Sequence, residues 1–130
     1  MAEGLVIDAS ALVDMLLQTD RGTAVTDRIA GAELHAPAHV DSEVLSALGR
    51  LHRARLITAD YAESRLHRLV MIRMERHPLP PLLRGAWARR RNMRLADALY
   101  VELADRMGPA PLVTTDSRLA AAWPGAEVVE

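Results

Sequence analysis

Four carboxylates occupy comparable places in the sequence, beside the end of a predicted strand or the start of a predicted helix. Asp8 directly follows the apolar run of residues 5–7, and Asp116 follows a second apolar run near the end of the chain. The carboxyl ends of neighbouring parallel strands lie about 5 Å apart, so these two side chains are expected to face one cleft. Glu43 and Asp97 each lie near the start of a predicted helix that follows a connection from the sheet. The sequence therefore predicts that four acids meet at one edge of the sheet.

The chemistry expected of such a cluster is the binding of a hard cation. Packing like charges together is unfavourable unless cations neutralise them, and ligation by oxygen alone favours Mg²⁺ or Mn²⁺ over zinc. Each acid also has a structural alternative. Asp97 suits the dipole of its helix, Asp116 suits an N-cap, and Glu43 suits a capping arrangement. Asp8 has no structural task unless it bonds to nearby backbone amides.

Strands and helices alternate along the whole chain, which is typical of a parallel sheet with helices on both faces. We therefore expect an α/β, three-layer domain with a central, mostly parallel sheet of four to five strands. Ser10 is the expected N-cap of the first helix. Strands are predicted at residues 5–7, 34–36, 75–79, 111–115 and 126–129, and helices at residues 10–17, 23–30, 39–53, 58–73, 82–91, 95–107 and 117–122.

Composition narrows the class of protein. A chain of 130 residues, half of them hydrophobic, is expected to form one domain over residues 1–130 and is not intrinsically disordered. The absence of cysteine excludes disulfides and thiolate metal sites. Residues 1–4 lack the basic region of a secretory signal, and no apolar stretch is long enough to span a bilayer. The protein is therefore expected in the cytoplasm, without a membrane association.

Charge is divided unevenly along the chain. All 16 basic residues are arginine, and 12 of them lie in residues 50–94, which carry a net charge of +9 against −10 for the remainder. Such a division suits a nuclease, because cations hold a phosphate backbone and carboxylates hold a divalent metal. The alternative is a set of arginines on solvated helix faces.

Four short motifs contain the four acids: VIDASAL at residues 6–12, SEV at 42–44, LADALY at 95–100 and LVTTD at 112–116. They resemble the motifs of the PIN-domain family, and more narrowly those of VapC toxins from type II toxin–antitoxin pairs. The resemblance covers nearly the whole chain, including its length and the spacing of its acids. It implies a PIN-like fold.

The resemblance also implies a metal-dependent endoribonuclease. Asp8, Glu43, Asp97 and Asp116 would hold one or two Mg²⁺ or Mn²⁺ ions, with a metal-activated water attacking an RNA phosphodiester. Asp8 and Asp97 would be direct ligands, whereas Glu43 and Asp116 would bind a second ion or orient the water.

Further side chains have expected supporting roles. Ser10 and Thr114 match small hydroxyl positions of the family, where they would bond to metal-bound water or a phosphate; local capping and strand-end bonding are the alternative. A group of arginines just before Asp97 is expected to clamp RNA phosphates, with a solvated helix end as the alternative. These are Arg89, Arg90, Arg91 and Arg94.

Other polar residues are expected to be structural. Asp14 is expected on the surface, and Asp41 is expected to cap a helix because it points away from Glu43. The five histidines show no ligand pairing in the sequence.

The resemblance implies three partners: an RNA substrate, a cognate antitoxin whose tail covers the acidic cleft, and a second copy of the chain in a homodimer. The alternative function is a non-catalytic PIN-like module that binds RNA or protein. Phosphotransfer domains of the receiver or haloacid-dehalogenase type are disfavoured, because they use a lysine near the phosphoryl group and this chain has none.

Overall fold

A five-stranded parallel sheet forms the centre of the protein. The computed structural model describes residues 2–130; Met1, the first residue of the predicted domain, lies outside the described residues. The strand order is β3-β2-β1-β4-β5, and every neighbouring pair is parallel. The expected α/β architecture is therefore confirmed. The strands are β1 (Gly4–Ile7), β2 (Glu33–Pro37), β3 (Glu75–His77), β4 (Leu112–Thr114) and β5 (Ala126–Val128).

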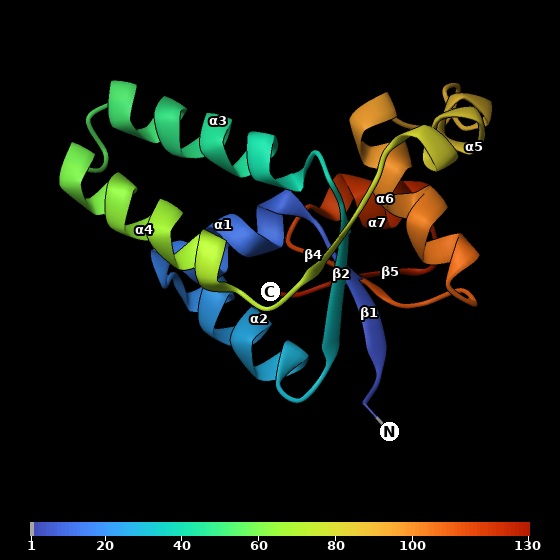
Figure 1. Ribbon diagram of the computed structural model, residues 1–130, viewed down its shortest axis with the longest axis horizontal. Helices are drawn as coiled ribbons and strands as arrows, with labels where there is room; N and C mark the ends of the chain where they lie inside the picture. The colour runs from blue at the N-terminus through green and yellow to red at the C-terminus, as the bar shows by residue number, and fades with distance from the viewer. Residues whose placement is uncertain (1) are drawn as a thin grey trace.

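Helices cover both faces of this sheet (Figure 1). One face carries α1 (Ala9–Leu17), α2 (Asp20–Ile29), α3 (Val40–Arg53) and α4 (Ala59–Met71). The other carries α5 (Leu83–Ala88), preceded by the 3₁₀ turn η1 (Pro80–Leu82), together with α6 (Leu95–Arg106) and α7 (Ser117–Ala122). This division follows from right-handed crossovers, because the chain moves from β1 towards β3 and then from β4 towards β5. Over residues 2–130, no helix has the length and hydropathy needed to cross a membrane.

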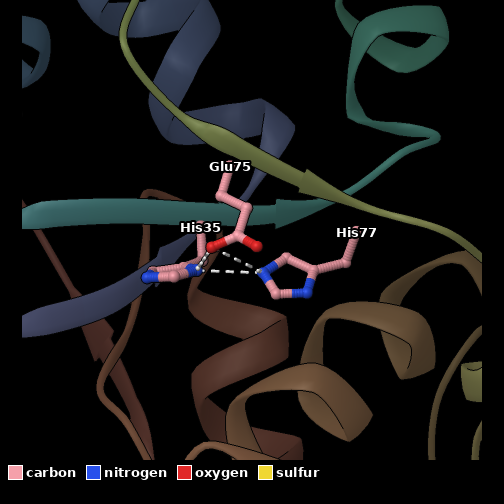
Figure 2. Close-up of side chains that lie close together, drawn as sticks. All are labelled: His35, Glu75 and His77. Carbon is pink, nitrogen blue, oxygen red and sulfur yellow. Dashed lines mark hydrogen bonds and ion pairs between the residues drawn. The ribbon is translucent and has the colours of Figure 1, made fainter.

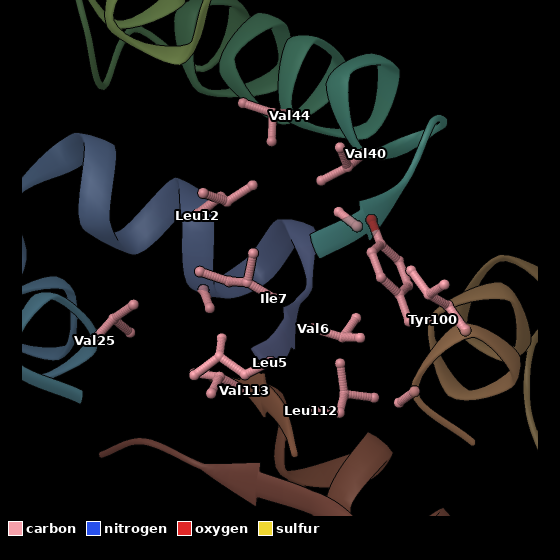
Figure 3. Packing of buried hydrophobic residues seen from close by; sticks show 14 of the residues in the cluster. Leu5, Val6, Ile7, Leu12, Val25, Val40, Val44, Tyr100, Leu112 and Val113 are labelled. Atoms are coloured by element: carbon pink, nitrogen blue, oxygen red, sulfur yellow. The ribbon is translucent and has the colours of Figure 1, made fainter. Parts of the chain in front are cut away.

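The central strand β1 is buried on both faces, as its uninterrupted apolar sequence predicts. Leu5, Val6 and Ile7 have no exposed surface and pack among side chains from both helical layers (Figure 3). Connections leave β1 and its neighbour β4 in opposite directions across the sheet. Open α/β sheets place their ligand sites at such a switch point, beyond the carboxyl ends of the two strands.

Capping explains two local differences from the sequence predictions, at the starts of α1 and α2. The N-cap of α1 is Asp8, whose carboxylate accepts a hydrogen bond from the Ala11 amide, so the prediction for Ser10 was wrong. Helix α2 starts at Asp20, three residues before its predicted start, because the Thr19 hydroxyl caps it. The predicted cap of α4 by Thr58 is confirmed.

The helices α1 and α2 pack at close range through a glycine. A Cβ atom at Gly22 would overlap the carbonyl oxygen of Asp14 and lie 2.9 Å from the Cα of Met15. Because these are backbone atoms, they cannot rotate away. The contact fixes α2 against the part of α1 that carries Asp14.

Gly22→Ala is expected to destabilise the protein by about 1–3 kcal/mol, because the two helices must separate to admit the methyl group. Gly49→Ala in the interior of α3 is the matched control, since a Cβ there meets only the end of the Arg53 side chain at 3.5 Å. The control is expected to be neutral or to stabilise by up to about 1 kcal/mol through helix propensity. Urea unfolding of both variants measures the difference, and equal midpoints would contradict the packing argument.

Candidate active site

A cleft of about 460 Å³ opens at the carboxyl ends of β1 and β4. All four predicted acids line it, from four separate parts of the chain: Asp8 after β1, Glu43 in α3, Asp97 in α6 and Asp116 after β4. The structure therefore brings the predicted carboxylates to one cleft. Within residues 2–130, however, no three of these four offer oxygen atoms that all lie within 4.8 Å of one another.

Asp8 lies at the floor of this cleft and is held from three directions. Its Oδ1 accepts hydrogen bonds from the Ser10 hydroxyl at 2.7 Å and from the Ala11 amide at 2.9 Å. Its Oδ2 accepts a bond from the Thr114 hydroxyl on β4. The carboxylate thus joins β1, the start of α1 and the end of β4, and only 5% of the residue is exposed.

Burial disfavours the charged form of this side chain. Desolvation raises the pKa of Asp8 from 3.8 to about 6, although its three hydrogen bonds act in the opposite direction. The negative charge of Asp97 adds a smaller upward contribution. A cation bound beside Asp8 would favour the ionised form. An all-oxygen donor set around a desolvated carboxylate therefore fits Mg²⁺ or Mn²⁺.

The two hydroxyl residues also bond to the backbone beyond β4. Ser10 Oγ accepts from the Thr115 amide at 3.2 Å, and Thr114 Oγ1 accepts from the Asp116 amide at 2.9 Å. The strand-end bonding considered for Ser10 and Thr114 is therefore present. Its effect is to fix the segment that leads to Asp116.

Glu43 is oriented by an aromatic residue that the sequence analysis did not select. The Tyr100 hydroxyl donates to Glu43 Oε1 at 2.6 Å, and His39 Nε2 lies 3.4 Å from the same oxygen. Burial and then the hydrogen bond to Glu43 raise the pKa of the Tyr100 phenol, so it remains a donor. Tyr100 is three residues beyond Asp97, a spacing that places both on one helix face.

Asp97 forms an ion pair with Arg94, the residue just before its helix α6. Arg94 Nε lies 3.1 Å from Asp97 Oδ2, and Nη2 lies 3.4 Å from Oδ1. The pKa of Arg94 is raised by Asp97 and, more weakly, by the charges of Asp116 and Glu43. Arg94 is therefore a cation in the field of three of the four acids, on a side chain that is 67% exposed. A metal ion at Asp97 would compete with this guanidinium.

Asp116 has the structural role considered as its alternative, because it caps α7. Its Oδ1 accepts from the Arg118 amide at 2.9 Å and lies 3.4 Å from Arg118 Nε. Both contacts use Oδ1, so capping does not consume the second oxygen. Capping and a position beside the cleft are compatible for this residue.

Two acids differ from their expected surroundings. Asp14 lines the cleft, where its carboxylate accepts from the hydroxyls of Thr19 at 2.9 Å and Thr115 at 2.7 Å, so its prediction as a surface acid was wrong. Asp14 lies four residues after Ser10 on α1, a spacing that places both on one helix face and could have indicated its position in the cleft. Asp41 pairs with Arg76 at 2.7 Å instead of capping its helix.

The predicted arginines occupy different environments. Arg94 lines the cleft, whereas Arg89 is held by Glu102 at 3.2 Å and Asp105 at 2.9 Å. Arg90 lies over the Trp87 ring, 4.8 Å from its centroid, and Arg91 is exposed in the turn after α5. Two arginines that the sequence analysis did not select also line the cleft, Arg21 and Arg50.

Comparison with known proteins adds family evidence to this geometry. The family model for the PIN domain matches residues 5–122. Ribonuclease VapC3 of Mycobacterium tuberculosis is 53% identical over 128 residues, covering 98% of this chain and 93% of the relative. Among solved structures, PAE2754 from Pyrobaculum aerophilum has a TM-score of 0.66 at 29% identity, covering 99% of this chain and 92% of its own.

A toxin–antitoxin complex from Klebsiella pneumoniae is also similar in fold. Its TM-score is 0.68 at 17% identity, and the match covers 97% of this chain and 98% of the other. At that identity the likeness concerns the fold alone.

Asp8→Asn is expected to stabilise the metal-free protein at neutral pH. Because the folded pKa of about 6 lies above the ordinary value of 3.8, the native state of the wild type loses stability as the pH rises between these values. The shift in the pKa of Asp8 corresponds to a loss of roughly 3 kcal/mol in the free energy of unfolding of the wild type. The variant regains less than this, because its altered bond to Thr114 costs about 1 kcal/mol. The uncharged variant should gain about 1–2 kcal/mol at neutral pH and nothing near pH 4.

Urea unfolding in the presence of a chelator, at both pH values, measures this difference. Asp60→Asn, at an exposed position in α4, is the control and should show no such pH-dependent gain. A stability difference between the Asp8 variant and the wild type that does not change with pH would contradict the desolvation argument.

Proposed function

Since the chain belongs to the PIN-domain family and, within it, to the VapC ribonucleases, we propose that it is a Mg²⁺- or Mn²⁺-dependent endoribonuclease whose active site is the acidic cleft. We propose further that it is the toxin of a VapBC-type pair. The observation that carries the site assignment is the buried carboxylate of Asp8, which lines one cleft together with Glu43, Asp97 and Asp116.

The roles proposed for the four acids are those that the family resemblance implies. Asp8 and Asp97 hold the cation directly, and Glu43 and Asp116 bind a second ion or orient the attacking water. When bound, the cation supplies an activated water and stabilises charge on the phosphate. Asp8 is already fixed for this task by its hydrogen bonds, and Glu43 is fixed by Tyr100.

Arginines at the mouth of the cleft are proposed to bind the RNA backbone. Arg94, Arg21 and Arg50 line the same cleft as the acids, which supports a role for their guanidinium groups in binding phosphates. Arg94 would exchange its bond to Asp97 for a phosphate when the cation binds. Arg90 and Arg91 are proposed to extend this basic surface from the exposed turn after α5.

Two protein partners belong to the proposal. A cognate antitoxin would cover the acidic cleft and its arginines. A second copy of the chain would form a homodimer, and the apolar surface of α5 and α6 supports this. There Leu83, Trp87 and Leu95 are 52%, 57% and 44% exposed.

Asp97→Asn is expected to reduce Mg²⁺-dependent RNA cleavage by on the order of 100-fold or more, because a metal ligand is lost. Asp60→Asn is the matched control: both residues lie in the first turn of a helix, so both substitutions remove the same favourable dipole interaction. Cleavage of total RNA at fixed enzyme concentration measures the effect. Wild-type cleavage by the Asp97 variant would overturn the site assignment and favour a non-catalytic binding module.

Replacing Arg90 and Arg91 with alanine is expected to weaken RNA binding and flatten its dependence on salt. Each phosphate contact that is lost should reduce the slope of log K against log salt by about 0.7 for single-stranded RNA. Arg53→Ala is the control, because this exposed arginine ends α3 about 15 Å along the helix from Glu43. Binding is measured in a chelator to prevent cleavage. An unchanged slope would show that Arg90 and Arg91 do not contact RNA phosphates and are only solvated surface residues.

A further inference from the structure

Two histidines and a glutamate converge at the edge of the sheet, away from the acidic cleft. His35 lies on β2, and Glu75 and His77 lie on the edge strand β3 (Figure 2). In the parallel register His35 is opposite Glu75 and Pro37 is opposite His77, so alternation places the three side chains on one face. The structure thus brings together two histidines for which the sequence showed no ligand pairing. None of the three residues lines the acidic cleft.

The separations of their donor atoms lie around the value expected for a tetrahedral metal site. His35 Nδ1 lies 2.9 Å from His77 Nε2 and 3.3 Å from Glu75 Oε2, and the last two atoms are 3.9 Å apart. Metal–ligand bonds of about 2.0–2.1 Å in tetrahedral geometry place two ligand atoms about 3.3 Å apart. The three observed distances bracket that value.

A single hydrogen bond joins the two imidazoles of this cluster, and its direction depends on which nitrogen carries the proton. If the imidazole atom His35 Nδ1 carries the proton, the lone pair of His77 Nε2 faces the carboxylate of Glu75. If His77 Nε2 carries it, the lone pair of His35 Nδ1 faces the same carboxylate. Two protonated nitrogens would oppose each other at 2.9 Å. With both imidazoles neutral, one proton on His35 Nδ1 or His77 Nε2 is shared among three electron-pair donors, whereas one cation would bond to all three.

The donor types select the metal. Two imidazole nitrogens and one carboxylate oxygen suit Zn²⁺, whereas Mg²⁺ prefers oxygen alone. The side chains of His35 and His77 are 15% and 25% exposed, and that of Glu75 is 65% exposed, so an ion can enter from solvent. Three protein ligands leave a fourth position for water.

We propose that His35, Glu75 and His77 form a Zn²⁺ site that clips the edge strand β3 to β2. Strand β3 has three residues and pairs only with β2 among the described strands. The clip would connect segments 42 residues apart in sequence. Because the three ligands meet only in the folded chain, Zn²⁺ binding stabilises the native state.

Calorimetric titration of Zn²⁺ into untagged, chelator-treated protein tests this site. Excess Mg²⁺ is present to occupy the acidic cleft. The wild type is expected to bind one equivalent of Zn²⁺ per chain and to gain thermal stability from it. Glu75→Gln and His77→Gln should lose more than the roughly 10- to 100-fold in affinity typical of changes around a metal ligand.

Matched controls separate this site from other histidines and acids. His67→Gln and Glu33→Gln change exposed residues of the same types and should bind Zn²⁺ as the wild type does. Circular dichroism in a chelator verifies the fold of each variant, and Glu75→Gln tests the site at its most exposed ligand. Co²⁺ substitution should give the intense visible absorption of a tetrahedral centre in the wild type but not in Glu75→Gln or His77→Gln.

The proposal is overturned if the wild type binds no Zn²⁺ at micromolar concentration. It is also overturned if both ligand variants bind Zn²⁺ normally. Loss of binding in Asp97→Asn, with normal binding in the Glu75 and His77 variants, would place Zn²⁺ in the acidic cleft and equally refute the clip.

Discussion

The burial of the Asp8 carboxylate is the constraint on which the rest of the site depends. A charge at the end of a fully buried strand is costly unless donors or a cation surround it. The chain supplies donors from α1 and from β4, and these same bonds hold the two strand ends together. They do not compensate fully, because the pKa of Asp8 remains raised. A bound cation would remove the remaining cost of burying this charge. The burial of Asp8 therefore underlies both the joining of the strand ends and the affinity for metal.

Elsewhere in the cleft, one acid is compensated by an exposed cation and another is held by a neutral buried donor. Asp97 is paired with Arg94, whose side chain is largely exposed, whereas Glu43 is held by the neutral hydroxyl of Tyr100. A guanidinium at the mouth can leave for a phosphate without disturbing the core. The protein thus keeps its rigid contacts on Asp8 and Glu43 and its exchangeable contact on Asp97.

The sequence predicted those features that depend on a single segment. An apolar run of three residues identified β1, and the acids at strand ends and helix starts identified the cleft. The features that the sequence did not predict depend on the order of the strands in the sheet or on which face of a helix a residue occupies. Asp14 was left out of the predicted site although it lies on the same face of α1 as Ser10. The N-cap of α1 was predicted to be Ser10, whereas it is Asp8. Since β2 and β3 had no predicted neighbours, nothing in the sequence indicated that His35 meets His77.

Donor chemistry keeps the two sites distinct. The cleft offers carboxylate oxygens around a desolvated floor, and the sheet edge offers two imidazoles and one exposed carboxylate. Hard Mg²⁺ gains little from imidazole, whereas Zn²⁺ gains much from it. Strand β2 leads directly into the turn before α3, the helix that carries Glu43. An ion that holds β3 against β2 therefore acts on the scaffold of the cleft without entering its chemistry, which separates effects on stability from effects on RNA cleavage.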